Sequence, residues 1–187
     1  METLKQPKFT GIIWLLLRLW LGYNWAMDGF EKVFGEGSAG WVGNKAGASV
    51  TGFLKGAIAK SYLAPDFVPG SRPGVQNWYA DLVQNVFMPN ATLFSYMVAY
   101  GELLVGIALI IGIFTRFSAL MGVIMNLSYL LAGTVSVNPQ MLVIGLLIVM
   151  GGAGVTYYAA DRFVIPFLKA QIAARTSGGQ APRPRTA

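Results

Sequence analysis

The sequence predicts an all-α membrane protein: a four-transmembrane-helix bundle with an outer loop that contains short amphipathic helices. Three observations lead to this fold class. Of the 187 residues, 55% are hydrophobic and only 12% are charged, whereas a soluble domain has about 25% charged residues. Four windows are apolar over roughly the 20 residues that a helix needs to cross a bilayer. Most of the Lys and Arg residues outside the longest connection lie near one end of these windows, which is the asymmetry that orients membrane proteins.

The predicted spans follow one another with one long interruption. They cover about residues 9–29, 91–114, 117–134 and 140–160. Asn90 and Asn138 precede the second and fourth spans, where Asn is a typical N-cap, and Pro139 suits a first helical position. We assign all four spans to one domain, residues 1–175. The Gly- and Pro-containing end, residues 176–187, has the composition of a disordered tail.

The interruption, residues 30–90, is not a plain loop. Two stretches place apolar residues at helical spacing, "WVGNKAGASVTGFLKGAIAKSYL" (41–63) and "VQNWYADLVQNVFM" (75–88). Between them, "APDFVPGSRPG" (64–74) is rich in Pro and Gly and predicts a turn. We expect two short amphipathic helices that lie on the outer surface or cap the bundle. Ordinary packing against the span ends is the alternative.

The basic residues predict the orientation. Those outside the long interruption and outside the spans fall on one side: Lys5, Lys8, Arg116, Arg162, Lys169, Arg175, Arg183 and Arg185. This side is expected to be cytoplasmic, so both termini are inside and residues 30–90 are outside. The chain is then a multi-pass protein of the cell (plasma) membrane, in contact with lipid. Its cations are scattered singly, so no nucleic-acid partner is expected.

Three spans carry a polar residue at mid-depth: Arg18, Glu102 and Asn126. An uncompensated charge at the bilayer centre costs at least about 2.5–3.5 kcal/mol. Counted from the cytoplasmic ends of their windows, the three residues lie at depths that agree within about one helical turn. We therefore expect Arg18 and Glu102 to form an ion pair inside the bundle, with Asn126 as a hydrogen-bonding neighbour.

This pair has two interpretations. It can be a structural pair that fixes which helices meet, or it can belong to a functional site in which Arg18 and Glu102 are the catalytic residues. Flat apolar walls with a few polar groups suit a quinone ring. The residues expected to bind the quinone or substrate are Trp25, Lys32, Asn126 and Tyr129. The chain has no Cys and no His, so no metal site and no haem ligand of those types is expected.

Four segments carry a resemblance to a known family. They are "RLWLGYNWAMDGFEKV" (18–33), "GELLVGIALIIGIFTR" (101–116), "MNLSYLLAGTVSVNPQM" (125–141) and "AADR" (159–162). With them the chain resembles the DoxX/DoxD family of four-helix membrane proteins. The likeness covers all four spans. It is closest to members with a long segment between the first two spans, such as the small subunit of thiosulfate:quinone oxidoreductase.

The resemblance implies a membrane subunit of a quinone-linked oxidoreductase. Electrons would pass from thiosulfate or a related sulfur donor to a membrane quinone, and Lys32, Lys55 or Lys60 would steer an anionic donor. Such a subunit implies a second protein subunit or a homo-oligomer. The alternative is a non-catalytic anchor or scaffold for a peripheral redox or thiol-stress partner. A small transporter or channel built by oligomerisation is a third class, which the lack of a broken helix or inverted repeat disfavours.

Overall fold

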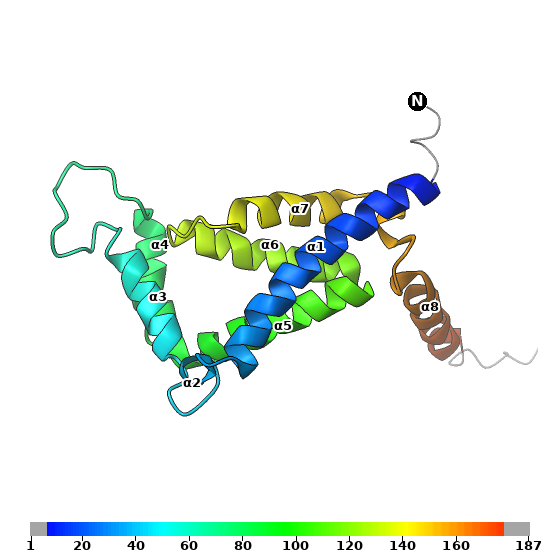
Figure 1. Cartoon of the computed structure of the whole chain (residues 1–187), viewed down its shortest axis with the longest axis horizontal. Coiled ribbons are helices and arrows are strands. Elements are labelled where there is room, and N and C mark those ends of the chain that lie inside the picture. Colours follow the sequence, from blue (N-terminus) through cyan, green and yellow to red (C-terminus); the bar gives the residue numbers. More distant parts are fainter. Residues whose placement is uncertain (1–6, 178–187) are drawn as a thin grey trace, which may run out of the picture.

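The computed structural model describes residues 7–177, a range that contains helices and turns but no strand (Figure 1). The α-helices are α1 (Pro7–Phe34), α2 (Ser38–Trp41), α3 (Ala48–Ile58), α4 (Asn77–Leu82), α5 (Ala91–Ile111), α6 (Thr115–Leu131), α7 (Asn138–Met150) and α8 (Asp161–Ser177). A π-helical turn, η2 (Val83–Phe87), follows α4, and a 3-10 turn, η3 (Ala153–Thr156), follows α7. The all-α prediction is confirmed. The predicted disordered tail lies outside the described residues, apart from its first two residues at the end of α8.

Four helices, α1, α5, α6 and α7, form a bundle in which α1 packs along α5 and α6 packs along α7. The approach of α1 to α5 is close because each contributes a glycine. A Cβ added at Gly29 would overlap with the backbone of Leu103, and one at Gly106 would overlap with the backbone of Ala26. Side chains from all four helices fill the core of this bundle: Leu21, Trp25, Val105, Leu109, Ala119, Met141 and Ile148.

By length and composition, α5 is the helix among the described residues that can cross a membrane, and α7 is a shorter apolar helix. The predicted fourth span, 140–160, is wrong in its extent. The helix ends at Met150, and Gly151 and Gly152 continue in extended conformation. Arg116 accounts for this end, because its guanidinium donates hydrogen bonds to the Gly151 oxygen at 2.6 Å and the Gly152 oxygen at 3.3 Å.

The two predicted asparagine caps are corrected in detail. Asn90 occupies the N-cap position of α5, but its amide donates to the Val86 oxygen at 2.8 Å instead of accepting from the first turn. Asn138 is the first residue of α7, and the N-cap position belongs to Val137. Pro139 lies in the first turn of α7, as expected from its fixed φ angle.

The segment between α1 and α5 caps one end of the bundle. Both predicted amphipathic helices are present, as α3 and as α4 with η2, and residues 64–74 join them without a helix. Their apolar faces form a second core with the ends of α5 and α6: Val50, Leu54, Val75, Tyr79, Val83, Ala91 and Ala132. These helices therefore form a cap that packs against the ends of α5 and α6.

Tyrosine hydroxyls strengthen this cap. Tyr79 donates to the Ser128 oxygen at 2.8 Å, which ties α4 to α6. Tyr62 donates to the Asp81 carboxylate, which ties the end of α3 to α4. Burial raises the pKa of Tyr79, and the hydrogen bond to Asp81 raises the pKa of Tyr62, so both phenols stay protonated donors at neutral pH.

At the other end of the bundle, the chain continues into a helix that the sequence analysis did not predict. The Asp161 carboxylate accepts the backbone N–H groups of Phe114 at 2.6 Å and Thr115 at 2.8 Å, and so caps the start of α6. The Asp161 N–H donates to the Gly112 oxygen at 2.9 Å. From this attachment α8 projects away from the bundle, near the N-terminal end of α1 (Figure 1).

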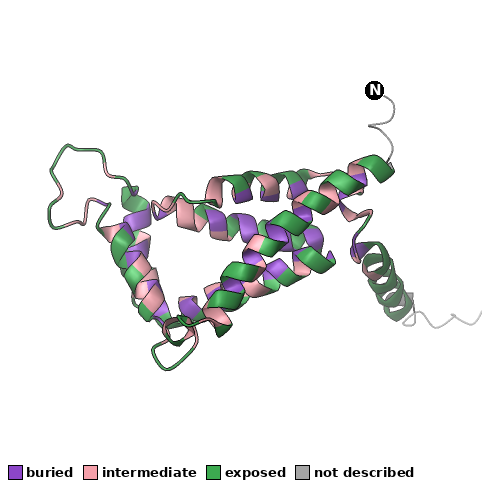
Figure 2. Ribbon diagram, viewed as in Figure 1, coloured by how far each residue is buried: buried purple, intermediate pink, exposed green. Residues whose placement is uncertain are grey.

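Much of the outward surface of α1, α5, α6 and α7 is exposed (green in Figure 2), and many of the exposed residues are large and apolar. They include Ile12, Leu16, Trp20, Leu93, Leu104, Ile107, Phe117, Ile124, Val143 and Leu147. The interior, in contrast, holds Arg18, Ser95, Glu102 and Asn126, each at most 2% exposed. Soluble proteins bury charged residues far less often than apolar ones. The bundle has the opposite arrangement, with charged residues inside and large apolar residues outside.

Candidate functional site

The predicted ion pair between Arg18 and Glu102 is wrong. In the antiparallel packing of α1 and α5, Gly29 lies against Leu103, and Arg18 lies beside Gly112, close to the end of α5. The reason is a difference in helix length. Because α1 runs well past the end of α5, equal distances from the ends of the two sequence windows are not equal depths in the bundle. Arg18 and Glu102 therefore occupy different ends of the α1–α5 contact.

Glu102 pairs instead with Lys32, about four turns further along α1 than Arg18, or about 21 Å. The Lys32 Nζ is 2.5 Å from the Glu102 Oε2. Tyr129 of α6 donates its hydroxyl to the other carboxylate oxygen at 2.7 Å. Three helices thus meet on one carboxylate. The Lys32 side chain is 20% exposed and that of Glu102 only 2%, so the ammonium lies between the carboxylate and the surface.

Aromatic rings surround this triad. The Trp41 ring lies 5.1 Å from the Lys32 ammonium, a cation–π distance. The Trp25 ring centre is 6.4 Å from that of Tyr129, and Phe53 from α3 meets the Tyr129 ring edge-on at 5.9 Å. Lysine at this position also suits the C-terminal turn of α1, where the helix dipole favours a cation.

Three buried polar atoms beside the triad have no hydrogen-bond partner. They are Trp25 Nε1, Asn126 Nδ2 and Asn126 Oδ1, on side chains that are each 1% exposed. The Trp25 indole lies against Gly122, one turn before Asn126 on the same face of α6. An unpaired buried donor costs about 1–3 kcal/mol. A carbonyl oxygen placed here would remove this cost by accepting from the indole or the amide.

Arg18 belongs to a second buried polar cluster, at the α8 end of the bundle. Its Nη2 donates to the Tyr158 oxygen at 2.9 Å, and its charge interacts with Asp161. Gly112 is required here, because any side chain would overlap with the guanidinium. Asp161 was not predicted as a site residue. Its sequence signal was a lone carboxylate directly after the last apolar window, in the "AADR" segment.

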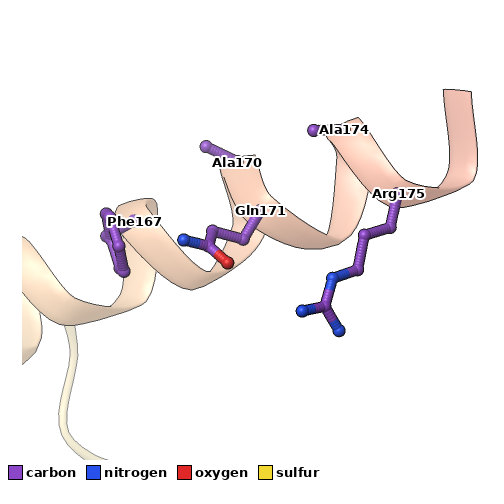
Figure 3. A pocket seen from close by; sticks show the side chains of 5 residues that line it. All are labelled: Phe167, Ala170, Gln171, Ala174 and Arg175. Carbon is purple, nitrogen blue, oxygen red and sulfur yellow. The ribbon is translucent and has the colours of Figure 1, made fainter. Parts of the chain in front are cut away.

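The remaining predicted residues are apart from the triad. Lys60 donates to the Gly133 oxygen at 2.9 Å, at the end of α6, and Lys55 is exposed on α3. One surface hollow lies in the outer loop around Lys60 and Arg72. A second lies on α8 (Figure 3). Neither is lined by a triad residue. Among residues 7–177, no group of three or more His, Cys, Asp or Glu side chains can hold a metal ion.

A helical bundle with buried charges inside and large apolar side chains outside has the features of the membrane class. A family model described as DoxX matches residues 13–135, more than half of the chain. The chain therefore belongs to the DoxX family, whose members are membrane proteins. No curated protein and no solved structure matches it. The matched range contains the whole Lys32–Glu102–Tyr129 triad and ends before Asp161.

Proposed function

We propose that this protein is the membrane-embedded subunit of a quinone-linked oxidoreductase, in which the Lys32–Glu102–Tyr129 triad forms a quinone site. Electrons would come from thiosulfate or a related sulfur donor through a second subunit. In this proposal α1, α5, α6 and α7 are four membrane spans, and the α8 end of the bundle faces the cytoplasm.

The exposed side chains support four spans. Large apolar residues cover α1, α6 and α7 as well as α5, although among the helices of residues 7–177 α5 alone is long and apolar enough to cross a membrane by itself. The 13 residues of α7 extend about 20 Å, so α7 needs the η3 segment to complete a crossing of about 30 Å. Described cations gather at the α8 end: Lys8, Arg116, Arg162, Lys169 and Arg175. The other end carries as many, Lys32, Lys45, Lys55, Lys60 and Arg72, but mostly in the long segment between α1 and α5, where cations count less toward orientation. The cations next to the short connections therefore support a cytoplasmic location for the α8 end.

The triad supports the quinone site. Reducing a quinone to a quinol requires two electrons and two protons, and protons are scarce at depth in a membrane. Lys32 and Tyr129 each donate a hydrogen bond to Glu102, and the Lys32 side chain is 20% exposed, so its ammonium is within reach of water. The unpaired Trp25 and Asn126 donors are suited to quinone carbonyl oxygens. Arg18 is not part of this site, because it lies about 21 Å from Lys32 along α1.

Electrons need another source. The chain has no Cys or His that could oxidise a sulfur compound or bind a redox metal. A partner subunit is therefore part of the proposal: it oxidises the donor, and this protein holds the quinone that accepts the electrons.

Two tyrosines provide a matched test. Tyr129→Phe removes the hydroxyl that donates to the Glu102 carboxylate at 2.7 Å, and Tyr79→Phe removes a hydroxyl that donates to the backbone oxygen of Ser128 at a similar distance, 2.8 Å. The protein is purified in mild detergent with its partner, bound quinone is extracted, and turnover with a soluble quinone analogue is measured. We expect Tyr129→Phe to lower turnover at least tenfold, since a positioned proton donor contributes about 10²–10⁴-fold to the rate of a proton-coupled step. Equal turnover in the two variants would contradict the proposal.

A second candidate function is a non-catalytic anchor for a peripheral partner. The observation in its favour is that no triad residue lines either surface hollow, and the carboxylate at the centre of the triad, Glu102, is only 2% exposed. An anchor would co-purify with a stoichiometric partner, contain no quinone and show no quinone-dependent turnover.

A further inference from the structure

Helix α8 presents an uncovered apolar surface. Phe163 is 74% exposed and Phe167 is 61% exposed. Figure 2 shows that most of the helix beyond its first turn is exposed. No other described helix packs extensively against it. Its attachment to the bundle is confined to its start, where Asp161 caps α6.

The residues of α8 divide between two faces. Phe163, Phe167, Ala170 and Ala174 recur every three or four residues and share one side, which continues through Val164 and Leu168. Arg162, Lys169 and Ala173 share the opposite side. The hollow on α8 has a single wall, since every residue that lines it belongs to this helix (Figure 3). Nothing in the described structure faces that wall.

The charge of α8 is of one sign. It carries Arg162, Lys169 and Arg175, and its single acidic residue, Asp161, is buried in the cap of α6. Arg162 and Lys169 lie opposite the apolar side, whereas Arg175 lies on it near the end of the helix. A helix with a broad apolar face and cations on the opposite face is the type that lies in the plane of a membrane surface. Each Lys or Arg near an anionic surface strengthens binding about fivefold.

We propose that α8 binds the cytoplasmic surface of the bilayer through anionic lipid headgroups, with the Phe163 and Phe167 side turned toward the acyl chains. Two observations favour lipid as the partner. The first is the positive charge of the helix. The second is its position at one end of the bundle, next to the exposed apolar sides of α1 and α5. The helix then holds the Asp161 cap, and with it the turn between α5 and α6, at the membrane surface. The inference rests on the membrane placement proposed above and is independent of the quinone site.

Adjacent alanines provide the test. Since the chain has no cysteine, Ala174→Cys and Ala173→Cys each give one labelling position, on the apolar and the cationic side respectively. The full-length variants are labelled with an environment-sensitive fluorophore and reconstituted into vesicles of phosphatidylcholine with phosphatidylglycerol. Quenching by lipids with a nitroxide in the acyl chain is then measured. Ile107→Cys, on the exposed side of α5, reports whether the bundle itself is in the bilayer.

The expected result is strong quenching at positions 107 and 174 and several-fold weaker quenching at 173. Lys169→Ala should lower the ratio of bound to detached α8 about fivefold, as judged by quenching at 174, and vesicles of phosphatidylcholine alone should lower it further. Equal quenching at 173 and 174, with 107 quenched, would overturn the inference alone. A label at 174 that is shielded from both lipid and aqueous quenchers would mean that protein covers α8, which also overturns it. Absence of quenching at 107 would overturn the membrane placement as well.

Discussion

Glu102 is more deeply buried than its partner Lys32, and this difference determines how the pair responds to mutation. Glu102 is almost fully enclosed, whereas the Lys32 ammonium is within reach of the surface and of the Trp41 ring. A lysine left without its carboxylate can extend its flexible stem toward water. A carboxylate left without its lysine cannot leave the interior.

We therefore expect Lys32→Met to be more destabilising than Glu102→Gln. The first leaves an unpaired buried charge, at a cost of about 3–5 kcal/mol. The second keeps an acceptor for Tyr129 and should cost about 1.5–3 kcal/mol. The double variant should be more stable than Lys32→Met alone. Thermal unfolding in mild detergent measures all three, and additive losses in the double variant would show that the two residues do not interact.

Asp161 is the corresponding residue at the α8 end. Asp161→Ala removes the acceptor for two backbone N–H groups of α6 and the charge that faces Arg18. We expect a loss of about 1–2 kcal/mol for the cap and a further loss for Arg18. Asp66→Ala, at an exposed position in the outer loop, is the control. Similar unfolding temperatures for the two variants would contradict the capping role.

At this scale the sequence predicted that a buried Glu102 requires a positive partner, and it placed Lys32, Tyr129, Trp25 and Asn126 in one site. It assigned the wrong partner because the depth of Arg18 depends on where α1 begins relative to α5. The boundaries of the apolar windows do not give the offset between α1 and α5 along the bundle. The close contact of Gly29 with Leu103 gives it.

Among the elements, the α1–α5 contact is the one that brings Lys32 to Glu102. Gly106→Ala adds a methyl group that overlaps with the Ala26 backbone, whereas Gly56→Ala in α3 meets open space. We expect Gly106→Ala to destabilise the protein by about 1–3 kcal/mol and Gly56→Ala to be neutral or to stabilise it by up to about 1 kcal/mol. Thermal unfolding of the two variants makes the comparison. An equal response would show that α1 and α5 are not held in this close register.

The positions of most helices followed from hydropathy and spacing, but the end of α7 and the whole of α8 did not. The apolar run through residue 160 gave no indication that the helix ends at Met150, because the end depends on Arg116 reaching the Gly151 and Gly152 oxygens from α6. The periodicity of α8 is weak, since Pro166 and Arg175 interrupt its apolar side. Tertiary hydrogen bonds, rather than the local sequence pattern, determine where α7 ends and where α8 is attached.

The whole molecule has two ends with different chemistry. One end carries the outer cap and the Lys32–Glu102–Tyr129 triad, and the other carries the Arg18–Asp161 cluster and α8. In the proposed topology the first end faces outward and the second faces the cytoplasm.

Cysteine labelling in intact cells and in inverted vesicles tests this topology. Lys55→Cys, exposed on α3, should react with a membrane-impermeant maleimide only in intact cells, and Arg175→Cys on α8 only in inverted vesicles. The native chain, which lacks cysteine, is the blank. Labelling of both positions from the same side would be incompatible with the three spans, α5, α6 and α7, that the proposed topology places between them.

In the proposed function, the Lys32–Glu102 pair takes part in quinone reduction and does not only hold the helices together. The most direct test of this role is quinone-dependent turnover of the Lys32→Met, Glu102→Gln double variant, assembled with its partner and shown by thermal unfolding to be folded. Methionine and a neutral amide fill the same space but supply neither the ammonium proton nor a carboxylate that can exchange it. We expect a folded complex without quinone-dependent turnover. Turnover equal to that of the native protein would contradict this role and leave the anchor as the better description.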